Sequence, residues 1–259
     1  MPNAQGQERK PQIVAISGAG SGIGQALALH FAQQNWQVIL IGRRLEALQT
    51  TASLCREIVS SAKLLCCPLD LSSADAQSQA ENWLRQNGIL SLDALINNAG
   101  QFVRGDTLSA DLADWMRMFE VNTLGPLRLT RACYPLLKIN RGAILNISST
   151  LGLKATVDTV AYSASKAALN NWAQAFAVQA ARDGVRVNTI CPGLVDTPIH
   201  GFHKAADKAQ TLEQLRNLQP LGRIGRPEDL TSLAFALCSA GSEWTTGAVV
   251  NIDGGIHLV

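Results

Sequence analysis

Seven short β-rich runs alternate with longer segments of helical character, and this alternation limits the folds open to the chain. The runs cover residues 13–17, 38–41, 63–67, 94–97, 143–147, 186–190 and 249–252. Several of them are apolar without alternation, as is typical of strands in a sheet that helices cover on both faces. The pattern predicts an α/β fold with a doubly wound, seven-stranded parallel sheet flanked by helices.

One domain accounts for the length of the chain. A chain of 259 residues lies in the range in which α/β folds form a single domain with a sizeable core. We therefore predict one domain over residues 11–259, preceded by a polar, flexible tail at residues 1–10. The region from about 194 to 219 departs from the alternation, and this predicts a substrate lid there.

Charge and composition exclude several classes of function. The 22 Lys and Arg residues against 20 Asp and Glu residues give a formal net charge of +2, which is too low for a nucleic-acid partner. No apolar stretch approaches the roughly 18 residues of a membrane span, so no membrane partner is expected. The cysteines form no C-x-x-C motif and the histidines no H-E-x-x-H motif, which predicts reduced thiols and no metal site. The polar N-terminal residues lack the apolar segment of a signal peptide, which favours a cytoplasmic location.

A glycine-rich run follows the first predicted strand and precedes a predicted helix. It reads Gly18-Ala-Gly-Ser-Gly22-Ile-Gly24. Glycines at a strand-to-helix turn allow a diphosphate to approach the backbone, and the helix N-terminus supplies N–H groups and a positive dipole end. A glycine-rich turn alone also occurs as a plain structural loop, but the strand before it and the helix after it favour the dinucleotide-binding turn of a Rossmann-type fold.

Two arginines stand where such folds usually carry a carboxylate for the ribose hydroxyl. Arg43 and Arg44 follow the second predicted strand, about 20 residues after the glycines. A guanidinium group cannot accept from a hydroxyl, but it matches a phosphate, so the 2′-phosphate of NADP(H) fits better than NAD(H), which stays possible. In the alternative interpretation the arginines only cap the strand or begin a solvated helix.

A phenol and an ammonium share one face of a predicted helix. Tyr162 and Lys166 stand four residues apart in an Ala-rich segment. A nearby cation favours the phenolate, so we expect Lys166 to lower the pKa of Tyr162 towards that of a useful acid/base. Upstream, the fifth predicted strand ends in Ser148 and Ser149, at the sheet edge where open α/β sheets bind ligands. On its own, a Tyr/Lys pair is more often a surface packing pair.

Together these motifs resemble the short-chain dehydrogenase/reductase family from about residue 13 to the end of the chain. The resemblance includes the glycine motif with Ser17 in place of a threonine, Asp70, and the run Asn97-Asn98-Ala99-Gly100. It implies a catalytic tetrad of Asn122, Ser149, Tyr162 and Lys166, with Ser149 rather than Ser148 chosen because Gly152 follows it in an S-x-x-G pattern. The expected cofactor-binding residues are Ser17, Gly18, Ser21, Gly22, Ile23, Gly24, Arg43, Arg44, Asp70, Asn98, Ala99, Gly100, Tyr162, Lys166, Pro192, Gly193, Val195 and Thr197.

The resemblance implies an NADP(H)-dependent oxidoreductase that interconverts carbonyls and alcohols by hydride transfer. Tyr162 is the expected general acid or base, Ser149 polarises the carbonyl, Lys166 lowers the tyrosine pKa and holds the nicotinamide ribose, and Asn122 positions a relay water. Two alternatives stay open. One is an NAD-linked alcohol or sugar dehydrogenase, and the other is a non-catalytic dinucleotide-binding sensor.

Substrate identity depends on the walls of the pocket. We expect these walls to include Leu151, Leu153, Val157, Ile199 and Phe202. Because they are mainly apolar, they favour a moderately hydrophobic ketone, aldehyde or 3-oxoacyl substrate. The segments 111–138 and 162–182 resemble the helix pair through which the family forms dimers, so the expected assembly is a homodimer or a homotetramer.

Overall fold

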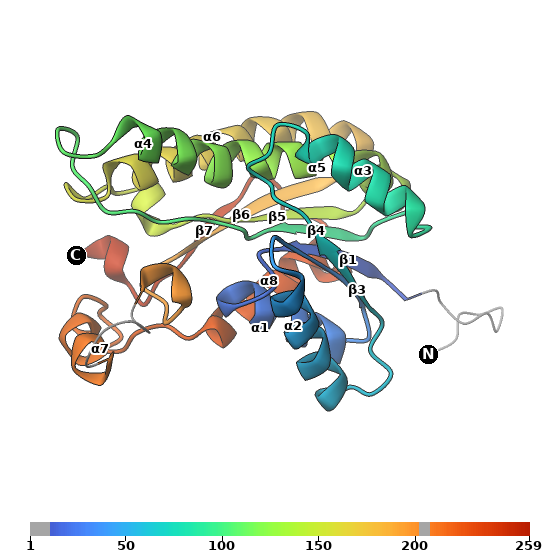
Figure 1. The fold of residues 1–259 in the computed structure, drawn as a ribbon, viewed down its shortest axis with the longest axis horizontal. Coiled ribbons are helices and arrows are strands. Elements are labelled where there is room, and N and C mark those ends of the chain that lie inside the picture. Colours follow the sequence, from blue (N-terminus) through green and yellow to red (C-terminus); the bar gives the residue numbers. More distant parts are fainter. Residues whose placement is uncertain (1–10, 202–207) are drawn as a thin grey trace.

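Seven parallel strands form one sheet in the order β3-β2-β1-β4-β5-β6-β7 (Figure 1). The computed structural model describes residues 11–201 and 208–259, without the side chains of residues 208, 209 and 211. The strands are β1 Ile13–Ser17, β2 Gln37–Gly42, β3 Leu64–Pro68, β4 Ala94–Asn97, β5 Ala143–Ile147, β6 Arg186–Pro192 and β7 Val249–Ile252. The predicted seven-stranded parallel sheet is confirmed.

Helices cover both faces of the sheet (Figure 1). Their bounds are α1 Gly22–Gln33, α2 Leu45–Ile58, α3 Ala76–Gln86, α4 Leu112–Phe119, α5 Gly125–Asn140, α6 Val160–Ala180, α7 Lys208–Arg216 and α8 Thr231–Cys238. Helices α1, α2 and α8 lie on one face, and α3, α5 and α6 lie on the other. None of the helices in the described part of the chain is long and apolar enough to cross a membrane.

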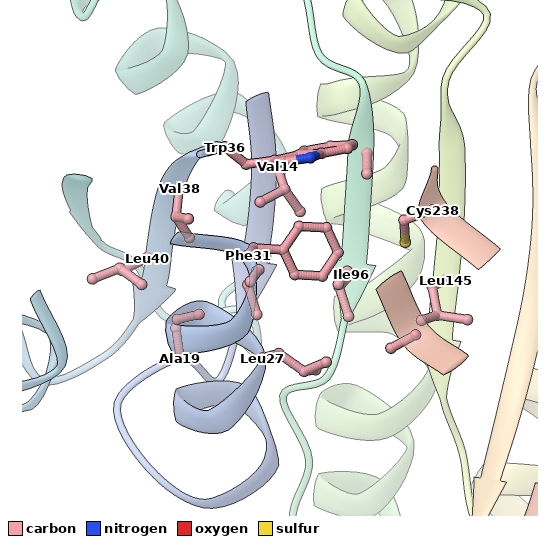
Figure 2. Close-up of a cluster of buried hydrophobic side chains, with 14 of the residues drawn as sticks. Val14, Ala19, Leu27, Phe31, Trp36, Val38, Leu40, Ile96, Leu145 and Cys238 are labelled. Atoms are coloured by element: carbon pink, nitrogen blue, oxygen red, sulfur yellow. The ribbon is translucent and has the colours of Figure 1, made fainter. Parts of the chain in front are cut away.

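The strands are apolar at successive positions because successive residues point alternately to the two faces of the sheet, and helices cover both faces. In β1, Val14 and Ile16 belong to the core under α1, whereas Ala15 belongs to the core under α5 and α6. Figure 2 shows the first of these cores, in which the ring of Phe31 from α1 lies close to Trp36. Their ring centroids are 5.2 Å apart in an edge-on arrangement. Burial on both faces therefore explains the unbroken apolar runs in the sequence.

The strand order reverses between β1 and β4, and this reversal places the ligand-binding edge. The chain builds β2 and β3 on one side of β1 and β4 to β7 on the other. In open α/β sheets, ligands bind outside the carboxyl ends of the strands at such a switch point. The carboxyl ends here are Ser17 of β1 and Asn97 of β4.

All of one predicted segment and part of another lie outside the described residues. The first is the predicted tail at residues 1–10. The predicted lid at 194–219 contains a short helical turn, Pro198–His200, and helix α7, but residues 202–207 between them are not described. The assignments of tail and lid stay predictions.

Candidate active site

A cavity of about 290 Å³ runs along the carboxyl edge of the sheet. Arg43 and Asp70 line one end, and Ile199 and His200 line the other. Between them lie the glycine-rich turn, the ends of β4 and β5, and the first turns of α6. The structure therefore brings the two groups of motifs, the nucleotide motif and the Tyr/Lys motif, to one continuous site.

The glycine-rich turn has the backbone shape that a diphosphate requires. Gly18 and Gly22 adopt φ values of +66° and +55°. A residue with a side chain would be strained in this backbone conformation. A Cβ at Gly24 would lie 2.3 Å from the carbonyl oxygen of Gly18, so α1 packs directly against the turn. Helix α1 begins without a side-chain cap on Ser21 and without an acidic residue in its first turn. A helix N-terminus of this kind fits an anion.

Gly18, Ser21, Gly22 and Ile23 line the cavity, whereas Ser17 and Gly24 stand behind it. The buried Ser17 hydroxyl accepts hydrogen bonds from the backbone N–H groups of Asn98 and Ala99, at 2.9 and 3.0 Å. The Asn98 side chain in turn donates to the Ser17 carbonyl at 2.9 Å. These contacts hold the ends of β1 and β4 together, and Asn98, Ala99 and Gly100 line the cavity beside them.

The far end of the cavity combines positive charge with one carboxylate. Arg43 and Arg44 follow β2, and both line the cavity with exposed side chains. Burial raises the pKa of Asp70, but hydrogen bonds from Ser72 and the charge of Arg43 outweigh it and hold that pKa below its usual value. Two guanidinium groups at this position fit a phosphate, and the ionised Asp70 fits a hydrogen-bond donor.

Tyr162 and Ser149 form the hydroxyl pair of the site. Ser149 follows β5, Tyr162 lies in the first turn of α6, and both side chains line the cavity although they are only 8% and 6% exposed. Burial raises the pKa of Tyr162 to about 12, although a hydrogen bond with Ser149 lowers it. The expected lowering of this pKa by Lys166 is therefore wrong for the protein alone, because desolvation of the phenolate dominates. The phenol is protonated at neutral pH.

Lys166 is buried one helical turn beyond Tyr162. Its Nζ donates a hydrogen bond to the carbonyl of Ile147 at 2.8 Å and lies 5.9 Å from the centre of the Tyr162 ring. Burial lowers the pKa of Lys166 to about 8, so its charge changes near neutral pH. The neighbouring Ser148 hydroxyl donates to the Lys166 carbonyl at 3.4 Å. Ser148 thus binds the backbone of α6, whereas Ser149 binds the phenol.

Asn122 is held in a π-helical turn, Glu120–Leu124, between α4 and α5. Its side-chain oxygen accepts from the Gln101 N–H at 2.8 Å, and its amide nitrogen donates to the Gln101 carbonyl at 2.9 Å and to Ser165 Oγ at 3.0 Å. A Cβ at Gly100 would lie 3.4 Å from the Asn122 oxygen and 3.7 Å from Lys166 Nζ. Asn122 is fully buried just behind the cavity, close to Lys166.

The segment after β6 closes the cavity opposite the glycine-rich turn. Pro192, the last residue of β6, lines the cavity, as do Gly193, Val195 and Thr197 after it. A Cβ at Gly22 would lie 3.2 Å from Thr197 Cγ2, so the two segments are in close contact. A dinucleotide between them would contact the backbone of both.

The expected substrate residues separate into four groups. Ile199 lines the cavity, whereas Leu151 does not line it and packs against the buried cluster of Met118, Ala161 and Tyr162. Leu153 and Val157 do not line the cavity and are 51% and 81% exposed, because they follow the short turn Thr150–Gly152 that carries the chain away from β5. Phe202 lies outside the described residues.

Sequence reasoning missed Gln101 and His200, which both line the cavity. Their positions carried a signal that could have found them. Gln101 directly follows the Asn97–Gly100 motif, and His200 directly follows Ile199.

Comparisons with known proteins indicate the family of the chain. The family profile described as enoyl-(acyl carrier protein) reductase matches residues 18–257. The 3-oxoacyl-(acyl-carrier-protein) reductase FabG of Thermotoga maritima is 32% identical over 95% of this chain and 98% of its own length. A short-chain type dehydrogenase/reductase from Mycobacterium marinum superposes with a TM-score of 0.84, at 29% identity, over 95% of each chain. L-Sorbose reductase from Gluconobacter frateurii, complexed with NADPH and L-sorbose, gives a TM-score of 0.90 at 25% identity, over 96% of this chain and 98% of its own.

The sheet order and the cleft at its switch point are those of a Rossmann-type dinucleotide-binding fold. The chain belongs to the short-chain dehydrogenase/reductase family. It is accordingly an enzyme of carbonyl and alcohol substrates that uses a nicotinamide dinucleotide.

Proposed function

We propose that the protein is an NADP(H)-dependent carbonyl reductase that acts on a moderately hydrophobic ketone, aldehyde or 3-oxoacyl compound, with Asn122, Ser149, Tyr162 and Lys166 as its catalytic residues. The observation that carries the proposal is the buried Ser149–Tyr162 hydroxyl pair beside Lys166, in the same cavity as Arg43. Two adjacent hydroxyls at a cavity wall can both donate to one carbonyl oxygen. The NADPH bound by L-sorbose reductase supports the choice of cofactor.

The chain's own residues supply orientation and the proton. The nicotinamide, when bound, supplies the hydride for reduction or accepts it for oxidation. Ser149 donates a hydrogen bond that polarises the substrate carbonyl, and Tyr162 Oη gives up its proton to the oxygen as the alcohol forms. The protonated phenol of the free protein is the state that reduction requires.

Proton return to Tyr162 depends on the two residues behind it. The Lys166 ammonium stabilises the tyrosinate that is left after proton transfer. Asn122 Oδ1 lies near Lys166, where it can hold a water that replenishes the proton. In the oxidative direction the same groups act in reverse.

Arg43 is proposed to select NADP(H), so its removal should weaken the binding of NADPH more than the binding of NADH. We expect Arg43→Ala to raise the KM for NADPH by about 10- to 100-fold with little change in the KM for NADH, because the guanidinium contacts only the extra phosphate. Steady-state kinetics with both cofactors measure this change. The control is Arg56→Ala, because Arg56 is an exposed arginine late in α2 that does not line the cavity. Equal affinity of the wild type for the two cofactors would instead favour the NAD-linked dehydrogenase.

Assembly into a homodimer or homotetramer is also proposed, on the evidence of exposed apolar side chains. Leu112 and Met116 stand one turn apart on α4 and are 76% and 71% exposed, and Val178 on α6 is 71% exposed. Such side chains on neighbouring helices favour an interface. Sedimentation should show a species of at least two chains, and Met116→Glu should shift it towards the monomer. A monomeric profile of the wild type at micromolar concentration contradicts this assignment.

A further inference from the structure

The end of the cavity beside the hydroxyl pair carries two polar side chains that the reaction does not use. Gln101 lines the cavity there, and its backbone is held on both sides by Asn122, at 2.8 and 2.9 Å. The side-chain amide of Gln101 makes no hydrogen bond with the residues that the structure describes. A positioned backbone with an uncommitted amide at a cavity wall is arranged to meet a ligand group.

His200 lies at the same end and is tied to Tyr162 through one aromatic ring. The Phe102 ring stands edge-on to both residues, with its centroid 4.9 Å from that of Tyr162 and 5.6 Å from that of His200. Phe102 thus fixes the imidazole relative to the phenol that holds the substrate carbonyl. The edge-on geometry is the favoured one for aromatic pairs, so this spacing is well defined.

The imidazole of His200 is uncharged at neutral pH. Burial, with a smaller contribution from the charge of Arg104, lowers the pKa of His200 to about 4, although Asp196 opposes this change. A neutral imidazole has one N–H donor and one nitrogen acceptor, so it can pair with a hydroxyl or with a carbonyl group. It offers no charge to attract a carboxylate or a phosphate.

We propose that His200 and Gln101 form a specificity subsite that binds a second, uncharged oxygen of the substrate, a hydroxyl or a carbonyl near the one that is reduced. This inference rests on the proposed carbonyl reductase function and deepens it. The preferred substrate is then a hydroxyketone or a dicarbonyl compound rather than a plain ketone. A plain ketone gives the Gln101 amide no hydrogen-bond partner in a partly desolvated cavity, and this lowers its kcat/KM.

The test uses ketones that share a carbon skeleton and differ in the second oxygen. Butanone is compared with acetoin and diacetyl, and pentanone with acetylacetone, so that the second oxygen lies at either of two spacings. The measured quantity is the kcat/KM of NADPH-dependent reduction, expressed as the ratio of the oxygenated to the plain ketone. Comparing this ratio between wild type and variant cancels the greater intrinsic reactivity of the dicarbonyls.

We expect His200→Leu to lower the ratio about tenfold in at least one series, since one hydrogen bond is lost from the oxygenated substrate alone. His200→Asn, which keeps a donor and an acceptor, should restore most of the ratio, and Gln101→Leu should lower it independently. NADPH titration of each variant verifies that it is folded. Ratios that stay unchanged in both leucine variants and both series overturn the subsite.

Failure of the proposed function looks different. In that case the wild type reduces neither the ketones of the two series nor a larger ketone, aldehyde or 3-oxoacyl compound, or it reduces ketones equally well after Tyr162→Phe, and the subsite falls with it. If instead the turnover depends on Tyr162 while the ratios are insensitive to His200 and Gln101, only the subsite is rejected.

Discussion

Replacement of Tyr162 by Phe is expected to lower kcat for carbonyl reduction by about a thousandfold, while the dissociation constant of NADPH stays within about twofold. The substitution keeps the ring that packs against Phe102 and removes the proton that the proposed mechanism transfers to the substrate oxygen. The Ser149 hydroxyl remains and can still polarise the carbonyl, so a small residual rate is expected. NADPH oxidation and NADPH fluorescence titration measure the two quantities.

Tyr134→Phe is a matched control, because Tyr134 is the other of the two tyrosines in the chain. Its hydroxyl donates to Asp183 Oδ2 at 2.7 Å, and Tyr134 does not line the cavity. Burial raises the pKa of Tyr134 to about 12, as it does for Tyr162. The two tyrosines therefore share a high pKa, and we expect only the replacement of Tyr162 to lower the rate. A Tyr162→Phe enzyme with an undiminished rate contradicts the general-acid role.

Lys166 should give the reduction rate a pH dependence with a midpoint near pH 8. Burial lowers its pKa to about 8, so the ammonium is present below that pH and is lost above it. The tyrosinate formed by proton transfer is stabilised only while the ammonium is charged, so kcat should be highest below pH 8 and fall above it. Tyr162, with its pKa of about 12, stays protonated across this range and does not contribute.

Lys166→Met should therefore remove this midpoint and lower kcat by about a hundred- to a thousandfold at pH 7. Pre-steady-state reduction rates between pH 6 and 10 measure the profile without the influence of product release. Lys138→Met is the control, because Lys138 pairs with Asp183 at 3.1 Å on the surface of α5. A wild-type rate that is constant through pH 9, or that rises with pH, contradicts the role of the ammonium.

The fold could be predicted because the evidence for it is local in the sequence. Helical layers on both faces require apolar side chains at successive strand positions, and Val14, Ala15 and Ile16 show this requirement directly. The bounds 13–17, 94–97, 143–147 and 249–252 therefore match the structure at both ends. Strand β6 runs on to Pro192, two residues beyond its prediction. A proline at the end of a strand is compatible with pairing but gives a sequence pattern typical of a turn.

Site residues could be predicted where a sequence motif specified them. They could not be predicted where tertiary packing determines the burial or the orientation of a side chain. Tyr162 and Lys166 lie together because they are four residues apart on α6, but the direction of the Tyr162 pKa shift depends on burial, which the spacing does not reveal. Leu153 and Val157 were expected at the substrate on account of their hydrophobicity, and both are exposed. His200 is polar and next to Ile199, and only the structure shows that it lines the same cavity as Tyr162.

The position of Asn122 depends on one extra residue in the helix, because Asn122 lies in the π-helical turn Glu120–Leu124. A π turn contains one residue more than the α-helical turn it replaces. With one residue fewer, α4 and α5 could join as a regular helix and still pack on α6, but no amide would stand between Gln101 and Ser165. A single-residue deletion in this turn can therefore separate folding from the proposed catalysis, because the flanking helices can keep their register while the amide proposed to hold a relay water near Lys166 is lost.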